Sequence, residues 1–132
     1  MTMEFGIRTK LDLPYEQAVQ KITAALKAEG FGVLTEIDVK ATLRQKLNAD
    51  FRRYVILGAC NPPLAHRALS ANLDVGLLLP CNVIVYEEGE GTIVSAVNPM
   101  TLSILIQDDP ALGAVAEEAR LKLERAIASL KN

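Results

Sequence analysis

Three side chains of this sequence have the chemistry of a nucleophile, a base or a soft metal ligand: Cys60, Cys81 and His66. Cys60 directly precedes Asn61-Pro62, a pair typical of a helix start, so we expect its thiol at the N-terminal end of a helix. The partial positive charge of that end stabilises a thiolate. Cys60 is therefore a candidate nucleophile or ligand. The alternative is a small buried residue at the end of a strand.

The other two side chains are candidate partners of Cys60. Cys81 follows Pro80 at the start of an apolar segment, where it either packs in the core or joins Cys60. His66 is a candidate base, although residues six apart on a helix do not share a face, and a solvated surface histidine is the alternative. Both thiols and His66 are candidate ligands for zinc or another thiophilic metal. A fourth ligand would come from a carboxylate such as Glu36, from water or from a second subunit.

Amide and carboxylate side chains could complete such a site. Asn61, Asn82 and Asn98 each stand beside a turn-forming residue, and together they could orient a ligand at one end of a sheet. Capping of helices by Asn61 and Asn98 is the alternative. Glu36 and Asp38 alternate along one strand, where a pair of carboxylates either holds a metal or forms a solvated face.

Composition excludes several classes of function. The chain has 132 residues with 14 Lys and Arg against 16 Asp and Glu, and aromatic residues make up 5%. We therefore expect no nucleic-acid partner. Phosphate-binding glycine loops and a Gly-x-Ser-x-Gly elbow are absent from the sequence. The longest uncharged stretch, 91–107, is too polar for a membrane span, and no secretory signal is visible. We expect a cytoplasmic protein without a membrane partner.

Hydrophobic periodicity and turn residues predict a mixture of strands and helices. Glu88-Gly89-Glu90-Gly91 is a strong hairpin signal between two of the strands. The expected strands cover 5–11, 31–37, 54–57, 83–86 and 92–97; the expected helices cover 14–29, 39–47 and 64–71, then Asn98-Pro99 through Leu105, and a last helix from Asp109-Pro110. This order predicts a two-layer α+β fold, with a mostly antiparallel sheet and helices packed on one face.

Three of the strands are apolar at consecutive positions, namely Val55-Ile56-Leu57, Val83-Ile84-Val85 and Ile93-Val94. An antiparallel sheet with helices on one side normally has a polar second face. Either helices cover both faces, or the uncovered face meets another subunit. We expect a homodimer formed through the sheet.

Three segments resemble the DUF302 family, a group of small prokaryotic domains of unknown function. They are Gly30-Phe31-Gly32-Val33-Leu34-Thr35-Glu36-Ile37-Asp38, Ile56-Leu57-Gly58-Ala59-Cys60-Asn61-Pro62-Pro63-Leu64-Ala65 and Gly76-Leu77-Leu78-Leu79-Pro80-Cys81-Asn82-Val83. The resemblance extends from about Gly30 to Pro99. It implies that residues 1–132 form one compact α+β domain that pairs with itself, and it brings no reaction and no catalytic residues.

The leading hypothesis is a homodimer that binds a small ligand near the Cys60-Asn61-Pro62-Pro63 turn, where helix N–H groups could hold an anion. The residues expected at this site are Cys60, Asn61, Cys81, Asn82 and Glu36. The alternative is a thiol- or metal-dependent enzyme or redox protein that uses Cys60 with Cys81 and His66. A third hypothesis is a structural dimer that binds another protein.

Overall fold

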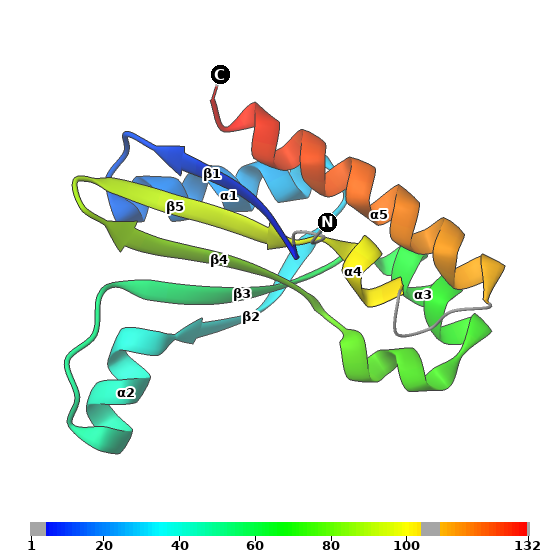
Figure 1. The fold of residues 1–132 in the computed structure, drawn as a ribbon, viewed down its shortest axis with the longest axis horizontal. Coiled ribbons are helices and arrows are strands. Elements are labelled where there is room, and N and C mark those ends of the chain that lie inside the picture. Colours follow the sequence, from blue (N-terminus) through cyan, green and yellow to red (C-terminus); the bar gives the residue numbers. More distant parts are fainter. Residues whose placement is uncertain (1–4, 104–108, 132) are drawn as a thin grey trace.

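The computed structural model describes residues 5–103 and 109–131, which contain one five-stranded sheet (Figure 1). The strand order is β1-β5-β4-β3-β2, and every neighbouring pair is antiparallel. The strands are β1 (Gly6–Leu11), β2 (Gly32–Asp38), β3 (Tyr54–Cys60), β4 (Cys81–Glu88) and β5 (Gly91–Val97). The hairpin between β4 and β5 turns at Gly89, whose positive φ of 60° explains the glycine there.

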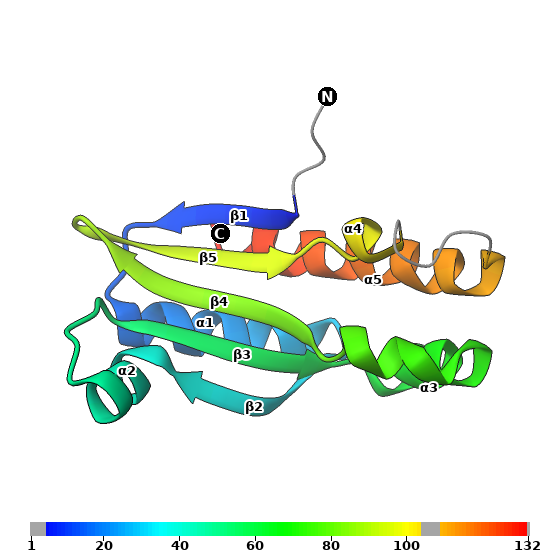
Figure 2. The ribbon, with the colours of Figure 1, turned by 60° about the horizontal axis from the view of Figure 1, so that its bottom comes forward.

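The helices pack on one face of this sheet and extend beyond both of its ends. They are α1 (Tyr15–Ala28), α2 (Val39–Leu47), α3 (Pro62–Ala71), the 3-10 helix η1 (Leu73–Leu78), α4 (Pro99–Ser103) and α5 (Pro110–Ser129). In Figure 2 the sheet faces the viewer, and α1 and α5 lie behind it. α2 projects from one end of the sheet, and α3 and η1 project from the other. The predicted two-layer α+β fold, with helices on one face, is confirmed.

The main hydrophobic core lies between the sheet and the two covering helices. α1 contributes a stripe at helical spacing, Ala18, Ile22 and Leu26, all of it fully buried. α5 contributes a similar stripe that includes Leu123 and Ile127. These stripes pack on the strand residues Val55, Leu57, Ala59, Val83, Val85, Val94 and Ala96. Alternation along each strand places these residues on the helix-covered face.

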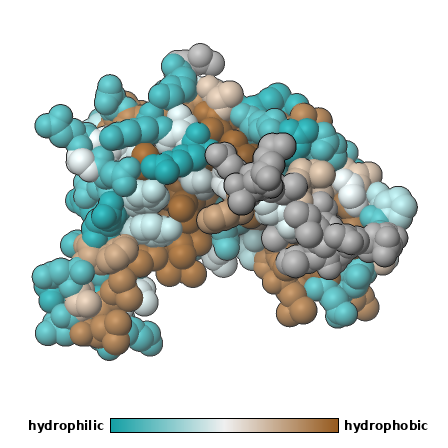
Figure 3. Space-filling view, viewed as in Figure 1, coloured by the Kyte–Doolittle hydropathy of each residue, from teal (hydrophilic) through white to brown (hydrophobic). Residues whose placement is uncertain are grey.

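The opposite face of the sheet is apolar in its centre and has no covering helix in the described chain. The register aligns Ile37 with Ile56 and Ile56 with Ile84 across three strands. Beside this row the rings of Tyr54 and Tyr86 stack, with centroids 5.2 Å apart. Figure 3 shows hydrophobic residues around the hollow between α2 and the lobe formed by α3 and η1. The prediction that the strands are apolar on both faces is confirmed.

Local structure differs from the sequence prediction in one described segment. Residues 73–78, for which no element was expected, form the helix η1, which begins where the Asn72 side chain accepts a hydrogen bond from Asp74 N at 2.9 Å. The expected helix after Asn98 begins as predicted, but its expected end at Leu105 lies outside the described residues. Within the described part of the chain, no helix is long and apolar enough to cross a membrane.

Candidate functional site

Strand pairing brings the two cysteines to the same end of the sheet. β3 ends at Cys60 and β4 begins at Cys81. Because Ala59 is the partner of Cys81 in the antiparallel register, Cys60 is one residue beyond the position opposite Cys81. The connection between β3 and β4 contains α3 and η1. Residues far apart in sequence therefore meet at one end of the sheet.

Both cysteines line a cavity of about 340 Å³ between this end of the sheet and the helices α3 and α5. The cavity is almost entirely apolar, and none of its lining residues carries a charge. The lining consists of Phe31, Leu34 and Thr35 around β2, Ala59, Cys60 and Cys81 at the strand ends, Asn61, Leu64, Ala65, Ala68 and Leu69 on α3, Leu79 and Pro80 before β4, and Val115 and Ala119 on α5.

The two cysteines of this cavity are both partly buried. Both are free cysteines, and no disulfide joins them. Burial, and to a smaller extent the neighbouring Cys60, raises the pKa of the Cys81 thiol to about 11. The Cys81 thiol is therefore protonated at neutral pH and acts as a weakly polar part of the wall.

Asn61 is buried and uses its side chain to join two helix ends. Its Oδ1 accepts a hydrogen bond from Leu64 N at 3.3 Å, which caps α3, and its Nδ2 donates to the carbonyl oxygen of Glu29 at 3.3 Å. Gly30 lies next to the Asn61 side-chain amide. Its φ is 88°, and a Cβ on this residue would be 3.0 Å from Asn61 Nδ2. The capping alternative for Asn61 is confirmed, as it is for Asn98, whose Oδ1 accepts from Met100 N at 3.0 Å.

The start of α3 does not supply the donors expected for an anion. Pro62 and Pro63 have no backbone N–H. The next two N–H groups are already used, because Leu64 N donates to the Asn61 side chain and Ala65 N donates to Asn61 O at 2.9 Å. The hypothesis that helix N–H groups of this turn hold an anion is therefore wrong. Pro62 and Pro63 are visible in the sequence, and their lack of backbone N–H groups already argues there against an anion at this turn.

Three other expected site residues lie away from the cavity. His66 is exposed on α3 and does not line the cavity. Asn82 is exposed opposite Gly58 on the uncovered face of the sheet, and Glu36 is exposed on β2 opposite Leu57.

The metal site expected from Cys60, His66 and Cys81 is consequently not formed. No group of three or more His, Cys, Asp and Glu side chains comes together among residues 5–103 and 109–131. The physical reason is the helical periodicity of α3, which directs His66 to solvent.

Pro80 lines the cavity and packs on Gly58, and neither residue was among the expected site residues. A Cβ on Gly58 would lie 2.8 Å from Pro80 Cγ and would also collide with Thr35 Oγ1. The absence of a side chain at Gly58 therefore lets the Leu79–Pro80 segment, whose peptide bond is cis, pack closely on β3. A glycine within an apolar strand is the sequence signal for such a close approach.

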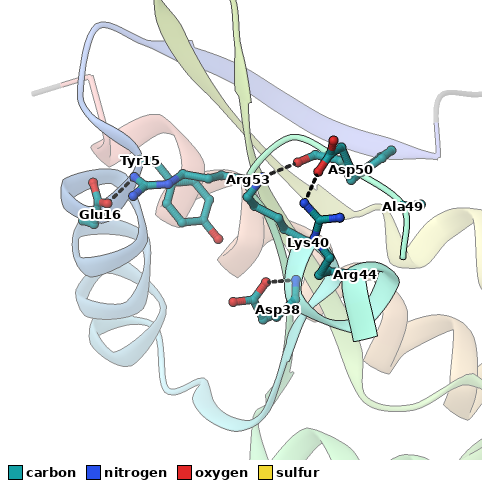
Figure 4. Close-up of a pocket in the computed structure, with 10 residues that line it drawn as sticks. Tyr15, Glu16, Asp38, Lys40, Arg44, Ala49, Asp50 and Arg53 are labelled. Atoms are coloured by element: carbon teal, nitrogen blue, oxygen red, sulfur yellow. Dashed lines mark hydrogen bonds and ion pairs between the residues drawn. The ribbon is translucent and has the colours of Figure 1, made fainter. Parts of the chain in front are cut away.

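A second, charged cavity of about 500 Å³ lies between the start of α1 and the α2 region (Figure 4). Its arginines are paired with acids: Arg53 with Glu16, and Arg44 with Asp50 at 2.7 Å. Burial raises the pKa of the Tyr15 phenol, and the carboxylates of Asp38 and Glu36 raise it further.

Comparison with known proteins assigns the chain to a family. A family model described as "Domain of unknown function DUF302" matches residues 7–130. The crystal structure of an uncharacterized conserved DUF302 protein from Bacillus stearothermophilus is 33% identical, and the match covers 96% of this chain and 98% of that chain with a TM-score of 0.87. No curated protein matches the chain. This chain belongs to the DUF302 family.

Proposed function

We propose that this protein binds a small, largely apolar ligand in the cavity that contains Cys60 and Cys81. The observation that carries the proposal is the lining, which is apolar apart from two thiols, Thr35 and Asn61. Ligand sites in proteins are concave, mostly apolar and furnished with a few polar groups that fix orientation. The cavity at the end of this sheet has that character.

The chemistry of the lining favours a neutral ligand over an anion. Transfer of a charge into surroundings without a partner is strongly unfavourable, and the lining offers no charged side chain. The volume of about 340 Å³ is sufficient for a ring-sized molecule, since an apolar cavity of about 150 Å³ holds benzene. Candidate ligands are therefore neutral and contain an aromatic or aliphatic body.

Titration with N-phenyl-1-naphthylamine, a neutral fluorescent probe, tests the proposal. Ala65 lines the cavity from α3, so Ala65→Phe fills it and should weaken probe binding by about tenfold or more. Ala71→Phe is the matched control, because Ala71 is exposed on the same helix and does not line the cavity. Equal probe binding by the two variants would refute the proposal.

The second candidate function is thiol chemistry by Cys60 with Cys81. The observation that favours it is that both free thiols line one cavity. Brief labelling of the native protein with a neutral maleimide near pH 7 should modify Cys60 selectively if Cys60 is a nucleophile, because Cys81 stays protonated. Modification of both cysteines only after denaturation would remove this candidate.

We also propose that the protein is a homodimer formed through the uncovered face of the sheet. What supports this is the row of Ile37, Ile56 and Ile84 beside the stacked Tyr54 and Tyr86, an apolar surface in the middle of a sheet. A contiguous apolar surface of this kind marks interaction sites. Light scattering at micromolar concentration should give twice the 14.3 kDa chain mass, and the monomer mass would contradict the proposal.

We also propose that residues 1–132 form a single domain. The described strands belong to one sheet with one main core. We therefore expect one cooperative unfolding transition with coincident fluorescence and circular dichroism curves. Two separated transitions would contradict it.

A further inference from the structure

A smaller cavity of about 60 Å³ adjoins the cavity that contains Cys60 and Cys81. The larger cavity is here the outer cavity and the smaller one the inner cavity. Both are lined by the same five residues, which therefore form the boundary between them: Ala68, Leu79, Cys81, Val115 and Ala119. The two cavities are adjacent compartments between α3, α5 and the start of β4.

The inner cavity is apolar and lies deeper in the protein than the outer one. Its other lining residues are Val75 and Leu78 on η1, Pro99 at the start of α4, and Leu112 and Ala116 on α5. Each described residue that lines it is buried or half-buried. The outer cavity, in contrast, is lined in part by Leu34 and Thr35, which are exposed on β2. A ligand that enters beside β2 therefore meets the inner cavity at its far end.

The sizes of the two cavities select the shape of the ligand. Benzene, with six carbons, fills an apolar cavity of about 150 Å³, so a volume of about 60 Å³ excludes a ring and accepts about two carbons of a chain. On the same scale the outer cavity of about 340 Å³ holds at most about 14 carbons. We propose that the ligand is an unbranched alkyl chain with an uncharged polar end, and that its tail passes Cys81 into the inner cavity. This inference rests on the proposed function, because it names the class of the neutral ligand.

The polar groups of the lining give the chain its direction. Thr35 and Asn61 line the outer cavity and not the inner one. Asn61 already uses both ends of its side-chain amide to join two helix ends, which leaves the exposed hydroxyl of Thr35 to bind an ester or alcohol group. A polar end beside Ala116 would lose its hydrogen bonds to water without replacement. The methyl end therefore occupies the inner cavity.

Displacement of N-phenyl-1-naphthylamine by 1-monoacylglycerols with saturated chains of 8 to 16 carbons tests the inference. Affinity for the wild type should rise by about fourfold for each added CH₂ group until the chain fills both cavities. Ala116 lines the inner cavity alone, and Ala116→Leu adds three carbons there. This variant should bind the 16-carbon chain about tenfold or more weakly and keep its affinity for the 8-carbon chain, which the outer cavity accommodates.

Two further variants accompany Ala116→Leu. Ala116→Val adds two carbons instead of three and should weaken binding of the 16-carbon chain by a smaller factor. Ala114→Leu is the matched control, because Ala114 is exposed on the same helix and lines neither cavity. Circular dichroism verifies that all three variants fold.

Two results would overturn the inference: equal affinity of Ala116→Leu and Ala114→Leu for the 16-carbon chain, or a loss in Ala116→Leu that is as large for the 8-carbon chain and the probe. Binding of the probe without displacement by any monoacylglycerol would also overturn it and would leave the proposed function standing. Absence of binding by both the probe and the monoacylglycerols would remove the proposed function as well.

Discussion

The side-chain amide of Asn61 donates a hydrogen bond to the carbonyl oxygen of Glu29 at 3.3 Å and thereby ties the start of α3 to the end of α1. Since its Oδ1 also caps α3, one buried side chain satisfies groups from two helix ends. This connection fixes α3 over the end of the sheet, where the helix forms one wall of the cavity.

Replacement of Asn61 by alanine should therefore lower the free energy of unfolding by about 1 to 3 kcal/mol. Asn61→Asp should also lower it, because a carboxylate retains the cap to Leu64 N but places an acceptor oxygen against the Glu29 carbonyl oxygen. The control is Asn72→Ala, which removes the more exposed cap of η1. Urea denaturation measures all three, and a loss for Asn61→Ala no larger than that for Asn72→Ala would contradict the assigned role.

Alanine at position 58 should destabilise the fold by about 1 to 3 kcal/mol, because its Cβ would overlap Thr35 and Pro80. Thr35→Ala removes one of the two obstacles, so the double variant should be less destabilised than the sum of the single variants. Gly113→Ala is the opposite case: space is open around this glycine of α5, and alanine should stabilise the helix by up to about 1 kcal/mol. A neutral effect of Gly58→Ala would disprove the close packing of Pro80 on β3.

The buried thiol of Cys81 should make the protein less stable at alkaline pH. Its pKa is about 11 in the folded chain against an ordinary 9.0, so between these values the unfolded chain has released a proton that the folded chain retains. The free energy of unfolding therefore falls as pH rises from about 9 to about 11, by up to about 3 kcal/mol. Urea denaturation of wild type and Cys81→Ala at pH 8.5 and 10.5 isolates this contribution, and an equal decline in both would contradict it.

A charge placed at the centre of the uncovered face of the sheet should prevent dimer formation. Ile84 lies between Ile56 and Ser95 in the register, so Ile84→Lys introduces a charge into the proposed interface. We expect this variant to sediment as a monomer while its circular dichroism spectrum stays unchanged. The matched control is Lys46→Glu, a charge reversal on the exposed surface of α2, which should leave the dimer intact. An Ile84→Lys variant that remains dimeric would exclude this face as the interface.

Local patterns in the sequence predicted most of the fold. Period-two alternation, helical stripes and Asn-Pro or Asp-Pro starts are short-range signals, and they located the strands and helices and the caps at Asn61 and Asn98. The apolar segment 73–78 gave no helical periodicity, because three residues per turn differ from the α-helical period. Its helix was missed for that reason.

The site could be predicted only in part from the sequence, because it depends on the pairing of strands that are far apart in sequence. That Ala59 pairs with Cys81 follows from the register of β3 and β4, which no local pattern records. His66 was included because of its chemistry, whereas the periodicity of α3 directs it away from Cys60. The missing N–H groups of Pro62 and Pro63, in contrast, could have been recognised from the sequence and would have excluded the anion hypothesis.

We propose that a neutral ligand occupies the cavity beside the two cysteines. The most direct test is an amide NMR titration of uniformly labelled protein with p-xylene as a small apolar probe. We expect shift changes concentrated at Ala59 to Asn61 and Leu64 to Ala68, with a second group at Val115 to Ala119, and their loss in Ala65→Phe. Shift changes centred on Ile37 and Ile84 of the open sheet face, or none at saturating probe, would contradict the claim.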